Sequence, residues 1–189
     1  LPQDHVTPRP APQSNAIFTA AMMRNGDKLA SYRRISETLD HLTTPDWSLI
    51  IAGDGPARPE VEKLMARFGQ RVTFLGTMNR AEMPDAYAQG QVFFWPGVNE
   101  AFGMVYLEAQ SHGLPVVAED RVGVREVLPR GALVPADDPK AAARLLDTVL
   151  SNANVGQELS DSVLRNMQDH HLLSSARRVL LETLGELTE

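Results

Sequence analysis

The chain has 189 residues, of which 43% are hydrophobic and 22% charged, a composition typical of one folded domain. Its formal net charge of −6 argues against a surface that binds nucleic acid through bulk positive charge, so we expect no nucleic-acid partner. The absence of cysteine excludes disulfides, thiolate metal sites and a cysteine nucleophile.

The sequence shows no signal for insertion into a membrane or for secretion. No apolar run approaches the roughly 18 residues of a membrane-spanning helix, and no signal peptide opens the sequence. The first residue is Leu1 rather than Met, and residues 1–14 are rich in proline, which predicts a linker or disordered arm. We expect a trimmed piece of a cytoplasmic protein, or of one peripheral at the inner face of the membrane through a missing domain.

After this arm, short apolar runs alternate with amphipathic segments. The turn at Asn25-Gly26 places Asp27 to cap the first helix. The predicted strands are residues 15–21, 47–52, 71–75, 92–95, 115–118 and 132–134. The predicted helices are residues 27–42, 58–68, 80–89, 103–111 and 139–150, with a short helical turn at 123–128 and one or two further helices over 154–189.

Strands that alternate with helices imply an α/β fold with a Rossmann-like, doubly wound parallel sheet of about six strands and helices on both faces. We expect residues 15–153 to form this domain. The helices of residues 154–189 lie beyond the sheet and pack on the same domain or on a missing N-terminal domain.

In such a sheet, ligands bind beyond the carboxyl ends of the strands, where the strand order reverses. If the order is 3-2-1-4-5-6, the first and fourth strands flank the reversal and lead into residues 22–28 and 97–103. The first segment carries two cations, Arg24 and Lys28, and the second carries an acid, Glu100. The sequence therefore predicts one crevice built from both segments.

The residues of this crevice suit a ligand that carries both phosphates and hydroxyls. A helix that starts at Gly103, just past a strand, presents unpaired N–H groups at which an anion can bind. Arg24 can fork onto two phosphate oxygens, and Lys28 offers a point charge. Glu100 and Glu108 bracket the same place, and carboxylates beside an anion site suggest a ligand rich in hydroxyls.

Each of these residues also has a purely structural interpretation. Arg24 and Lys28 could be solvated surface cations, and Gly103 could be a turn glycine. Glu100 could be an acid that favours the helix dipole, and Glu108 an exposed helix residue. A cation in the first helical turn is unfavourable by about 0.3–1 kcal/mol, so Lys28 favours an anionic ligand over surface decoration.

Other motifs offer less. The Gly-Asp-Gly turn at residues 53–55 lacks the third glycine of a dinucleotide fingerprint and follows the second strand, not the first. No Asp-x-Asp occurs, which argues against a divalent metal held by carboxylates at a diphosphate. His112 precedes a helix-ending glycine and is interpreted as structural, whereas His170 and His171 are interpreted as surface residues.

Several motifs, in order over roughly residues 17–150, resemble those of the retaining family 4 glycosyltransferases, also called glycosyl transferases group 1. Glu100, seven intervening residues and Glu108, followed by AQSHGLPVVA at residues 109–118, resemble the family signature. Further resemblances are IIAGDGP (50–56), VTFLG (72–76), VGVREV (122–127) and GALVP (131–135).

The resemblance implies a GT-B protein of two Rossmann-like domains, in which the C-terminal domain binds most of the nucleotide-sugar donor. This chain is similar to that C-terminal domain. The implied partners are a UDP-, GDP- or ADP-sugar as donor, an unknown acceptor and the missing N-terminal acceptor domain. No cofactor and no metal are implied.

The resemblance also implies roles for particular residues. Arg24 and Lys28 would hold the donor diphosphate and Glu100 would touch the sugar, which makes these three the catalytic candidates. The implied donor-binding residues are Phe102, Gly103 and Met104 at the sugar and phosphates, Glu108 at the ribose hydroxyls, and Gly76 to Met78 near the base.

The sequence departs from the family pattern at two places. The lysine usually lies five residues beyond the arginine, but Lys28 lies four beyond Arg24, and Met23 replaces the glycine before it. Val122 stands where the family often has the first glycine of a pair. These departures leave the reach of Arg24 and Lys28 open.

The predicted function is sugar transfer from the donor to an acceptor, in glycan or polysaccharide biosynthesis, by a retaining, metal-independent glycosyltransferase. Two alternatives stay open: a non-catalytic sugar-nucleotide-binding module, and a sugar-nucleotide epimerase on the same two-domain plan. The intact set of cations and paired acids favours the transferase over the module. The lack of a further acid or base, such as a well-placed histidine, counts against the epimerase. We expect this chain alone to bind donor without transferring sugar.

Overall fold

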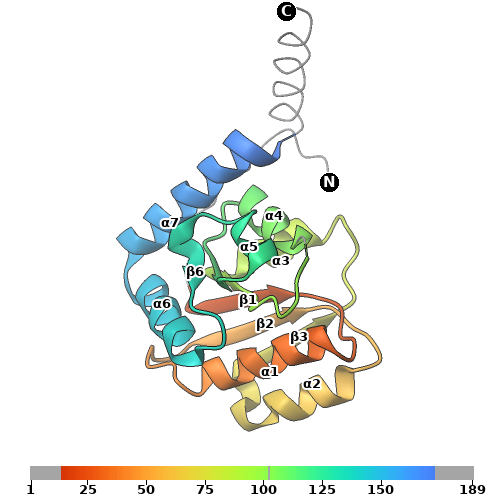
Figure 1. Cartoon of the computed structure of the whole chain (residues 1–189). Helices are drawn as coiled ribbons and strands as arrows, with labels where there is room; N and C mark the ends of the chain where they lie inside the picture. Colours follow the sequence, from red (N-terminus) through yellow and green to blue (C-terminus); the bar gives the residue numbers. More distant parts are fainter. Residues whose placement is uncertain (1–13, 102, 173–189) are drawn as a thin grey trace, which may run out of the picture.

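The computed structural model describes residues 14–101 and 103–172, so the predicted arm lies outside the described residues except for Ser14, and so does the segment 173–189. The described residues form a parallel sheet with helices on both faces (Figure 1). Within them the sheet has six strands in the order β3-β2-β1-β4-β5-β6. The predicted α/β class is confirmed, as is the strand order on which the predicted crevice depends.

The elements follow the predicted alternation. The strands are β1 (Ala16–Ala20), β2 (Ser48–Ala52), β3 (Val72–Gly76), β4 (Val92–Phe94), β5 (Val116–Glu119) and β6 (Leu133–Val134). The helices are α1 (Asp27–Leu39), α2 (Arg58–Met65), α3 (Met83–Gln89), α4 (Met104–Ser111), α5 (Val122–Arg125), α6 (Pro139–Ser151) and α7 (Ala153–Asn166). Shorter helical segments are η1 (Ala66–Arg71), η2 (Arg130–Ala132) and η3 (Met167–His171).

The helices form two layers around the sheet. On one face α1 contacts both α2 and α6, whereas α3 packs on β1 and α4 on β5 on the other (Figure 1). Helix α7 contacts α4 and α6. Because both faces are covered, the central strands β1 and β4 are buried throughout, and Ile17, Phe18, Phe93 and Phe94 are fully buried.

The start of α1 differs from the prediction. Asp27 does not cap the helix: Gly26 is the N-cap residue, and Asp27 is already the first helical residue. A side chain at that position lies too far along the helix to accept from the N–H groups that an N-cap residue reaches. The Asp27 carboxylate instead accepts a hydrogen bond of 3.0 Å from the side-chain amide of Asn99.

Three helices are shorter than predicted, and the first is α1, which ends at Leu39 rather than at residue 42. Helix α2 ends at Met65 rather than at residue 68, and the chain continues as the 3₁₀ segment η1, in which Gly69 has a positive φ of 56°. Helix α3 begins at Met83 rather than at residue 80. The Asn79 side chain accepts from the backbone N–H groups two and three residues ahead and so forms a separate turn before the helix.

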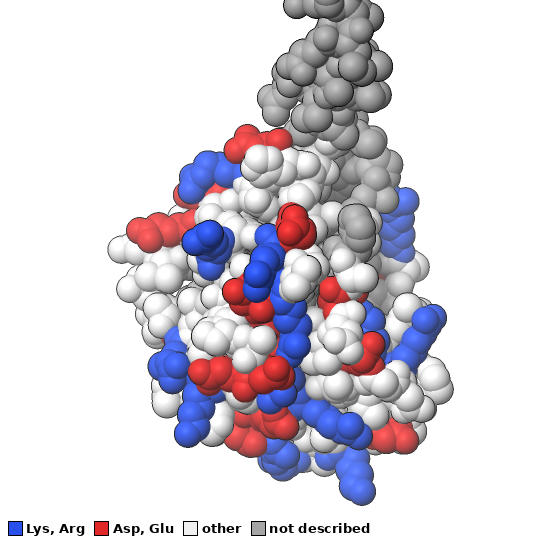
Figure 2. Space-filling view, viewed as in Figure 1, with Lys and Arg blue, Asp and Glu red and all other residues white. Residues whose placement is uncertain are grey.

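Figure 2 shows that Lys and Arg side chains alternate with Asp and Glu on the face that it displays. Within residues 14–101 and 103–172, no helix combines the length and the hydropathy that crossing a membrane requires. The expected cytoplasmic location and the expected absence of a nucleic-acid partner stay predictions.

The carboxylate of Asp147 connects α6 to the loop that follows α1. Asp147 in α6 accepts hydrogen bonds from the backbone N–H and the hydroxyl of both Thr43 and Thr44, in the loop between α1 and β2. Partial burial alone would raise the pKa of Asp147, but these hydrogen bonds outweigh burial and hold the pKa below its ordinary value of 3.8.

We expect Asp147→Ala to lower the free energy of unfolding by about 1–3 kcal/mol at pH 7, because four donors lose a charged acceptor. Since the pKa is lower in the folded state, this contribution is present above the unfolded-state pKa of 3.8 and is lost as the pH falls through the folded-state value. Urea unfolding at several pH values measures both effects. Asp161→Ala in α7, where the carboxylate bonds only to Gln157 among the described residues, is the matched control. Equal losses in the two variants would contradict the assignment.

Candidate functional site

The two segments that follow β1 and β4 meet at the reversal of strand order. The Lys28 ammonium in α1 lies 2.5 Å from Oε2 of Glu100, in the loop before α4. In the same place Asn99 donates to Asp27, and the backbone N–H of Val98 donates to a serine hydroxyl of α1 at 3.0 Å. The first turns of α1 and the β4–α4 loop are therefore bonded to each other. The two segments lie together, as the strand order predicted.

A tryptophan that the sequence did not single out completes this contact. Trp95 is fully buried directly after β4, and its indole N–H donates to Oε2 of Glu100 at 3.3 Å. The Lys28 ammonium lies 5.2 Å from the centre of the same indole ring, a distance at which a cation is attracted to the ring face. Glu100 is thus held from two sides.

This contact changes the interpretation of Lys28. From the sequence, Lys28 is a cation in a first helical turn that needs an anion, but Glu100 already supplies a negative charge. An ammonium group has three N–H donors, so a ligand phosphate can add to this contact or replace it. Glu100, in turn, does more than place a negative charge before α4, because it forms an ion pair with Lys28 of α1.

Arg24 lies in the exposed part of the β1–α1 loop. Among the described residues its guanidinium makes no hydrogen bond or ion pair, and only its backbone is fixed, by a hydrogen bond of 3.0 Å from Leu29 N–H to the Arg24 carbonyl. Arg24 and Lys28 therefore differ: Lys28 is paired with Glu100, whereas Arg24 is open to solvent.

The Gly-Asp-Gly turn after β2 supports the loop that carries Arg24. A β-carbon on Gly53 would lie 2.0 Å from the Ala21 carbonyl oxygen, and one on Gly55 would lie 2.4 Å from that of Met23. The two loops also exchange hydrogen bonds, since Met23 N–H donates to the Asp54 carbonyl at 2.9 Å. These glycines let the β2–α2 loop pack directly against the β1–α1 loop. The Gly-Asp-Gly turn therefore has a structural role in this chain.

Three further glycines shape the β4–α4 loop. A β-carbon on Gly97 would lie 2.2 Å from the Tyr106 hydroxyl oxygen, and one on Gly103 would lie 2.2 Å from the Tyr106 ring. One on Gly123, in α5, would lie 2.5 Å from the carbonyl oxygen of Glu100. Tyr106 is fully buried and donates to the Trp95 carbonyl at 3.0 Å, so the loop folds closely around a fixed ring.

The start of α4 lies beside this contact. Gly103 is the N-cap residue with φ 54° and ψ 46°, and no side chain of the described residues caps the helix. Met104 begins the helix with a half-exposed side chain. The first N–H groups of α4 therefore have no side-chain acceptor among the described residues, and the anion site expected there stays a prediction. Phe102, the remaining residue predicted here, lies outside the described residues.

Glu108 lies one turn further along α4, in the wall of a cavity of about 280 Å³ between α3 and α4. The cavity is lined by Arg80, Met83, Pro84, Tyr87, Met104, Glu108, Ser111 and His112. Glu108 is partly buried, and its Oε2 accepts a hydrogen bond of 3.1 Å from the Tyr87 hydroxyl. It is therefore not the fully exposed helix residue of the structural interpretation.

Gly76 and Met78 do not line this cavity. Gly76 ends β3, and its carbonyl accepts from Gly53 N–H at 2.7 Å. Met78 is partly buried against the core. Arg80, two residues beyond Met78 in the turn before α3, does line the cavity, and its closeness in sequence to the predicted base segment is the signal that points to it.

His112 has the structural surroundings that the sequence predicted, but it also lies in the wall of the cavity. His112 stacks on Tyr87 with ring centres 4.9 Å apart, and burial lowers its pKa below the ordinary 6.5, in keeping with a structural role. It also lines the cavity beside Glu108, which the sequence did not indicate. His170 and His171 contact each other, and within the described part of the chain no group of three His, Cys, Asp or Glu side chains is placed to hold a metal ion.

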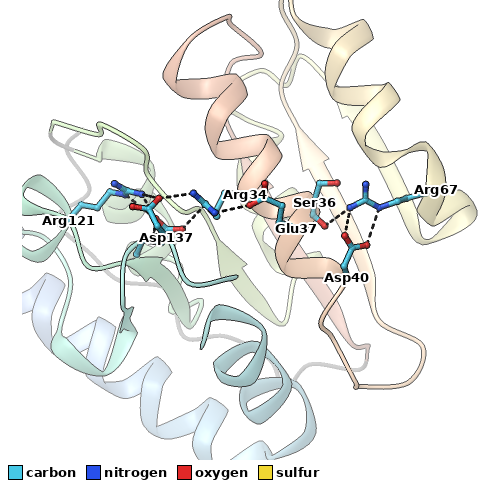
Figure 3. Close-up of polar contacts among 8 residues, drawn as sticks. Arg34, Ser36, Glu37, Asp40, Arg67, Arg121 and Asp137 are labelled. Atoms are coloured by element: carbon cyan, nitrogen blue, oxygen red, sulfur yellow. Dashed lines mark hydrogen bonds and ion pairs between the residues drawn. The ribbon is translucent and has the colours of Figure 1, made fainter. Parts of the chain in front are cut away.

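Ion pairs hold α1 in place on both sides (Figure 3). Arg34 of α1 and Arg121 both contact Asp137, at 2.7 and 3.0 Å. Both arginines also pair with Glu119, a buried carboxylate at the end of β5. On its other side α1 is bonded by Arg67 of η1. The helix that carries Lys28 is therefore fixed to both halves of the sheet.

Known glycosyltransferases resemble this chain in sequence. The family described as glycosyl transferases group 1 matches residues 14–152. The chain is 38% identical over 99 residues to the sulfoquinovosyl transferase SQD2 of Arabidopsis thaliana, covering 52% of this chain and 19% of that protein. It is 30% identical over 136 residues to the alpha-D-kanosaminyltransferase of Streptomyces kanamyceticus, covering 69% of this chain and 35% of that protein.

A solved structure extends the likeness in fold. Anabaena HepE, crystallised with UDP and glucose, superimposes with a TM-score of 0.75 at 20% identity over 91% of this chain and 48% of HepE. At that identity the match concerns the fold. The chain spans about half of this structure or less, and a fifth to a third of the two relatives above.

The close packing of the β4–α4 loop predicts a difference between the two glycines at the ends of α4. Gly103 and Gly113 have positive φ angles of 54° and 63°, so alanine at either position is strained by about 1–2 kcal/mol. Only at Gly103 does the new β-carbon also meet a buried ring at 2.2 Å, whereas at Gly113 the nearest atom is a leucine methyl at 3.4 Å. We expect Gly103→Ala to reduce the free energy of unfolding by about 1–3 kcal/mol more than Gly113→Ala.

Urea unfolding of the two variants measures this difference. Equal losses would mean that the loop can open without cost, and would contradict the fixed geometry described for Glu100.

Proposed function

Because the chain belongs to the glycosyl transferases group 1 family, we propose that it is the donor-binding domain of a retaining glycosyltransferase. The donor is a nucleoside diphosphate sugar, and the sugar passes to an acceptor in glycan or polysaccharide biosynthesis without a metal ion at the diphosphate. The observation that carries this proposal is the ion pair between Lys28 and Glu100, three residues before Gly103, the N-cap residue of α4, a helix that no side chain of the described residues caps.

The diphosphate binds between Arg24, Lys28 and the start of α4. Breaking the bond between the sugar and the diphosphate leaves negative charge on the diphosphate. Preorganised donors that meet this charge stabilise the transition state. The support for this assignment is that Arg24 is open to solvent, that α4 is uncapped and that Lys28 is held in place by α1.

Glu100 serves the sugar side of the same bond. Its carboxylate is fixed by Lys28 and by the Trp95 indole, so that it can accept sugar hydroxyls and favour the positive charge that develops on the ring. Gly103 and Met104 lie one helical turn or less from it and contact the sugar and phosphates. We assign Phe102 to the same region.

The nucleoside occupies the neighbouring part of the site. Glu108 accepts the ribose hydroxyls, which suits a partly buried carboxylate in a cavity of about 280 Å³. The base lies near Gly76 and Met78, at the end of β3. We expect a UDP-, GDP- or ADP-sugar as donor, and the UDP and glucose in the HepE crystal are in keeping with this class.

The remainder of the enzyme supplies the acceptor side. The chain spans 19% and 35% of two curated relatives, which leaves room for an N-terminal acceptor domain on the same polypeptide. The chain alone therefore binds donor but does not transfer sugar, because half of the cleft is absent. Turnover by the chain alone would overturn this part of the proposal.

We expect Glu108→Gln to weaken binding of the preferred nucleoside diphosphate by about 10-fold or more, since a hydrogen bond to a charged group contributes about 1.5–3 kcal/mol. Calorimetric titration of UDP, GDP and ADP into the chain identifies the preferred base and measures the loss. Glu158→Gln, at an exposed position of α7, is the matched control and leaves affinity unchanged. Unchanged affinity in Glu108→Gln as well would exclude the ribose role.

A further inference from the structure

The hydroxyl that contacts Glu108 belongs to a side chain that cannot move. Tyr87 in α3 is buried, with 1% of its surface exposed. Its ring meets Phe18 edge-on at 5.0 Å, lies 6.2 Å from Phe93 and stacks on His112 at 4.9 Å with an interplanar angle of 22°. Packing on three sides fixes both the ring and the position of its hydroxyl group.

This hydroxyl is a permanent hydrogen-bond donor. Burial raises the pKa of Tyr87 well above the ordinary 10, and the charge of Glu108 and the hydrogen bond to it raise the pKa further. The phenol therefore keeps its proton, and Oε2 of Glu108 keeps its partner at 3.1 Å. One oxygen of the carboxylate is thus fixed by the protein, whereas Oε1 has no hydrogen-bond partner among the described residues.

A carboxylate that is already oriented binds a ligand at lower cost. A free glutamate side chain loses rotamer freedom when it accepts a hydroxyl group, and prior fixing avoids a loss that corresponds to roughly 3- to 10-fold in affinity. A site built to bond a ligand hydroxyl also rejects an analogue that lacks it, because its polar groups are then left unpaired.

We propose that Tyr87 is a positioning residue, which orients Glu108 and thereby sets how strongly the site prefers a ribonucleotide to a nucleotide without ribose hydroxyls. This inference rests on the proposed function, because it takes Glu108 as the acceptor of the ribose hydroxyls. Tyr87 itself touches Glu108 and not the ligand.

Calorimetric titration of the chain with UDP, GDP and ADP, and with their 2′,3′-dideoxy counterparts, tests the proposal. Tyr87→Phe keeps the ring and removes only the hydroxyl group. We expect it to lose roughly 3- to 10-fold in affinity for the preferred ribonucleotide and nothing for the dideoxy counterpart. Ser36→Ala is the control, since that buried hydroxyl donates to the Leu64 carbonyl of α2 at 3.0 Å and its loss leaves both ring and carboxylate in place.

A double-mutant cycle with Glu108→Gln gives a second test, the coupling between the two substitutions in ribonucleotide affinity. A loss of folding stability alone would not produce such coupling. We expect the effect of Tyr87→Phe on ribonucleotide affinity to vanish once Glu108 is replaced. Additive effects, or equal losses for the ribose and dideoxy ligands, would overturn the positioning role and leave the proposed function standing. If the unmodified chain does not distinguish the two ligands, the ribose role of Glu108 fails, and the role of Tyr87 fails with it.

Discussion

The ion pair between Lys28 and Glu100 joins the two chain segments that carry the proposed diphosphate and sugar contacts. The strand order reverses between β1 and β4, so the loops that follow these strands separate unless something holds them together. The contacts of Lys28 with Glu100 and with the Trp95 ring, and the hydrogen bond from Asn99 to Asp27, do so. Glycines behind them let neighbouring loops pack without side chains between them, which fixes the backbone that carries the charged groups.

The strength of this ion pair decides whether it can yield to a ligand. The side chains of Lys28 and Glu100 are 30% and 19% exposed, and a pair open to water is worth about 0–1 kcal/mol. A diphosphate carries more charge than one carboxylate and also meets Arg24 and the start of α4. Exchange of Lys28 from Glu100 to phosphate is therefore cheap, and Glu100 keeps its indole partner during the exchange.

The alternation of elements predicted the parallel sheet. With the strand order 3-2-1-4-5-6 as a condition, it also predicted that the segments carrying Lys28 and Glu100 converge. The sequence did not single out Trp95 or Tyr87, whose roles depend on which way a buried ring points its polar atom. Nor could it place Asp27, since a shift of one residue at the helix start turns a cap into a bond to Asn99. Such details depend on three-dimensional packing that spacing does not encode.

The central claim is that a nucleoside diphosphate binds at the contact between α1 and the β4–α4 loop. The indole N–H of Trp95 reports on this contact directly, because it donates to Glu100. The chain has two tryptophans, and the other, Trp47, packs against Phe68 and Arg71 beside η1, so it serves as an internal control. Titration with UDP, GDP and ADP should shift the Trp95 indole resonance in a ¹⁵N–¹H spectrum in a saturable way and leave that of Trp47 in place. Saturable binding by calorimetry with no shift of the Trp95 resonance would contradict the account.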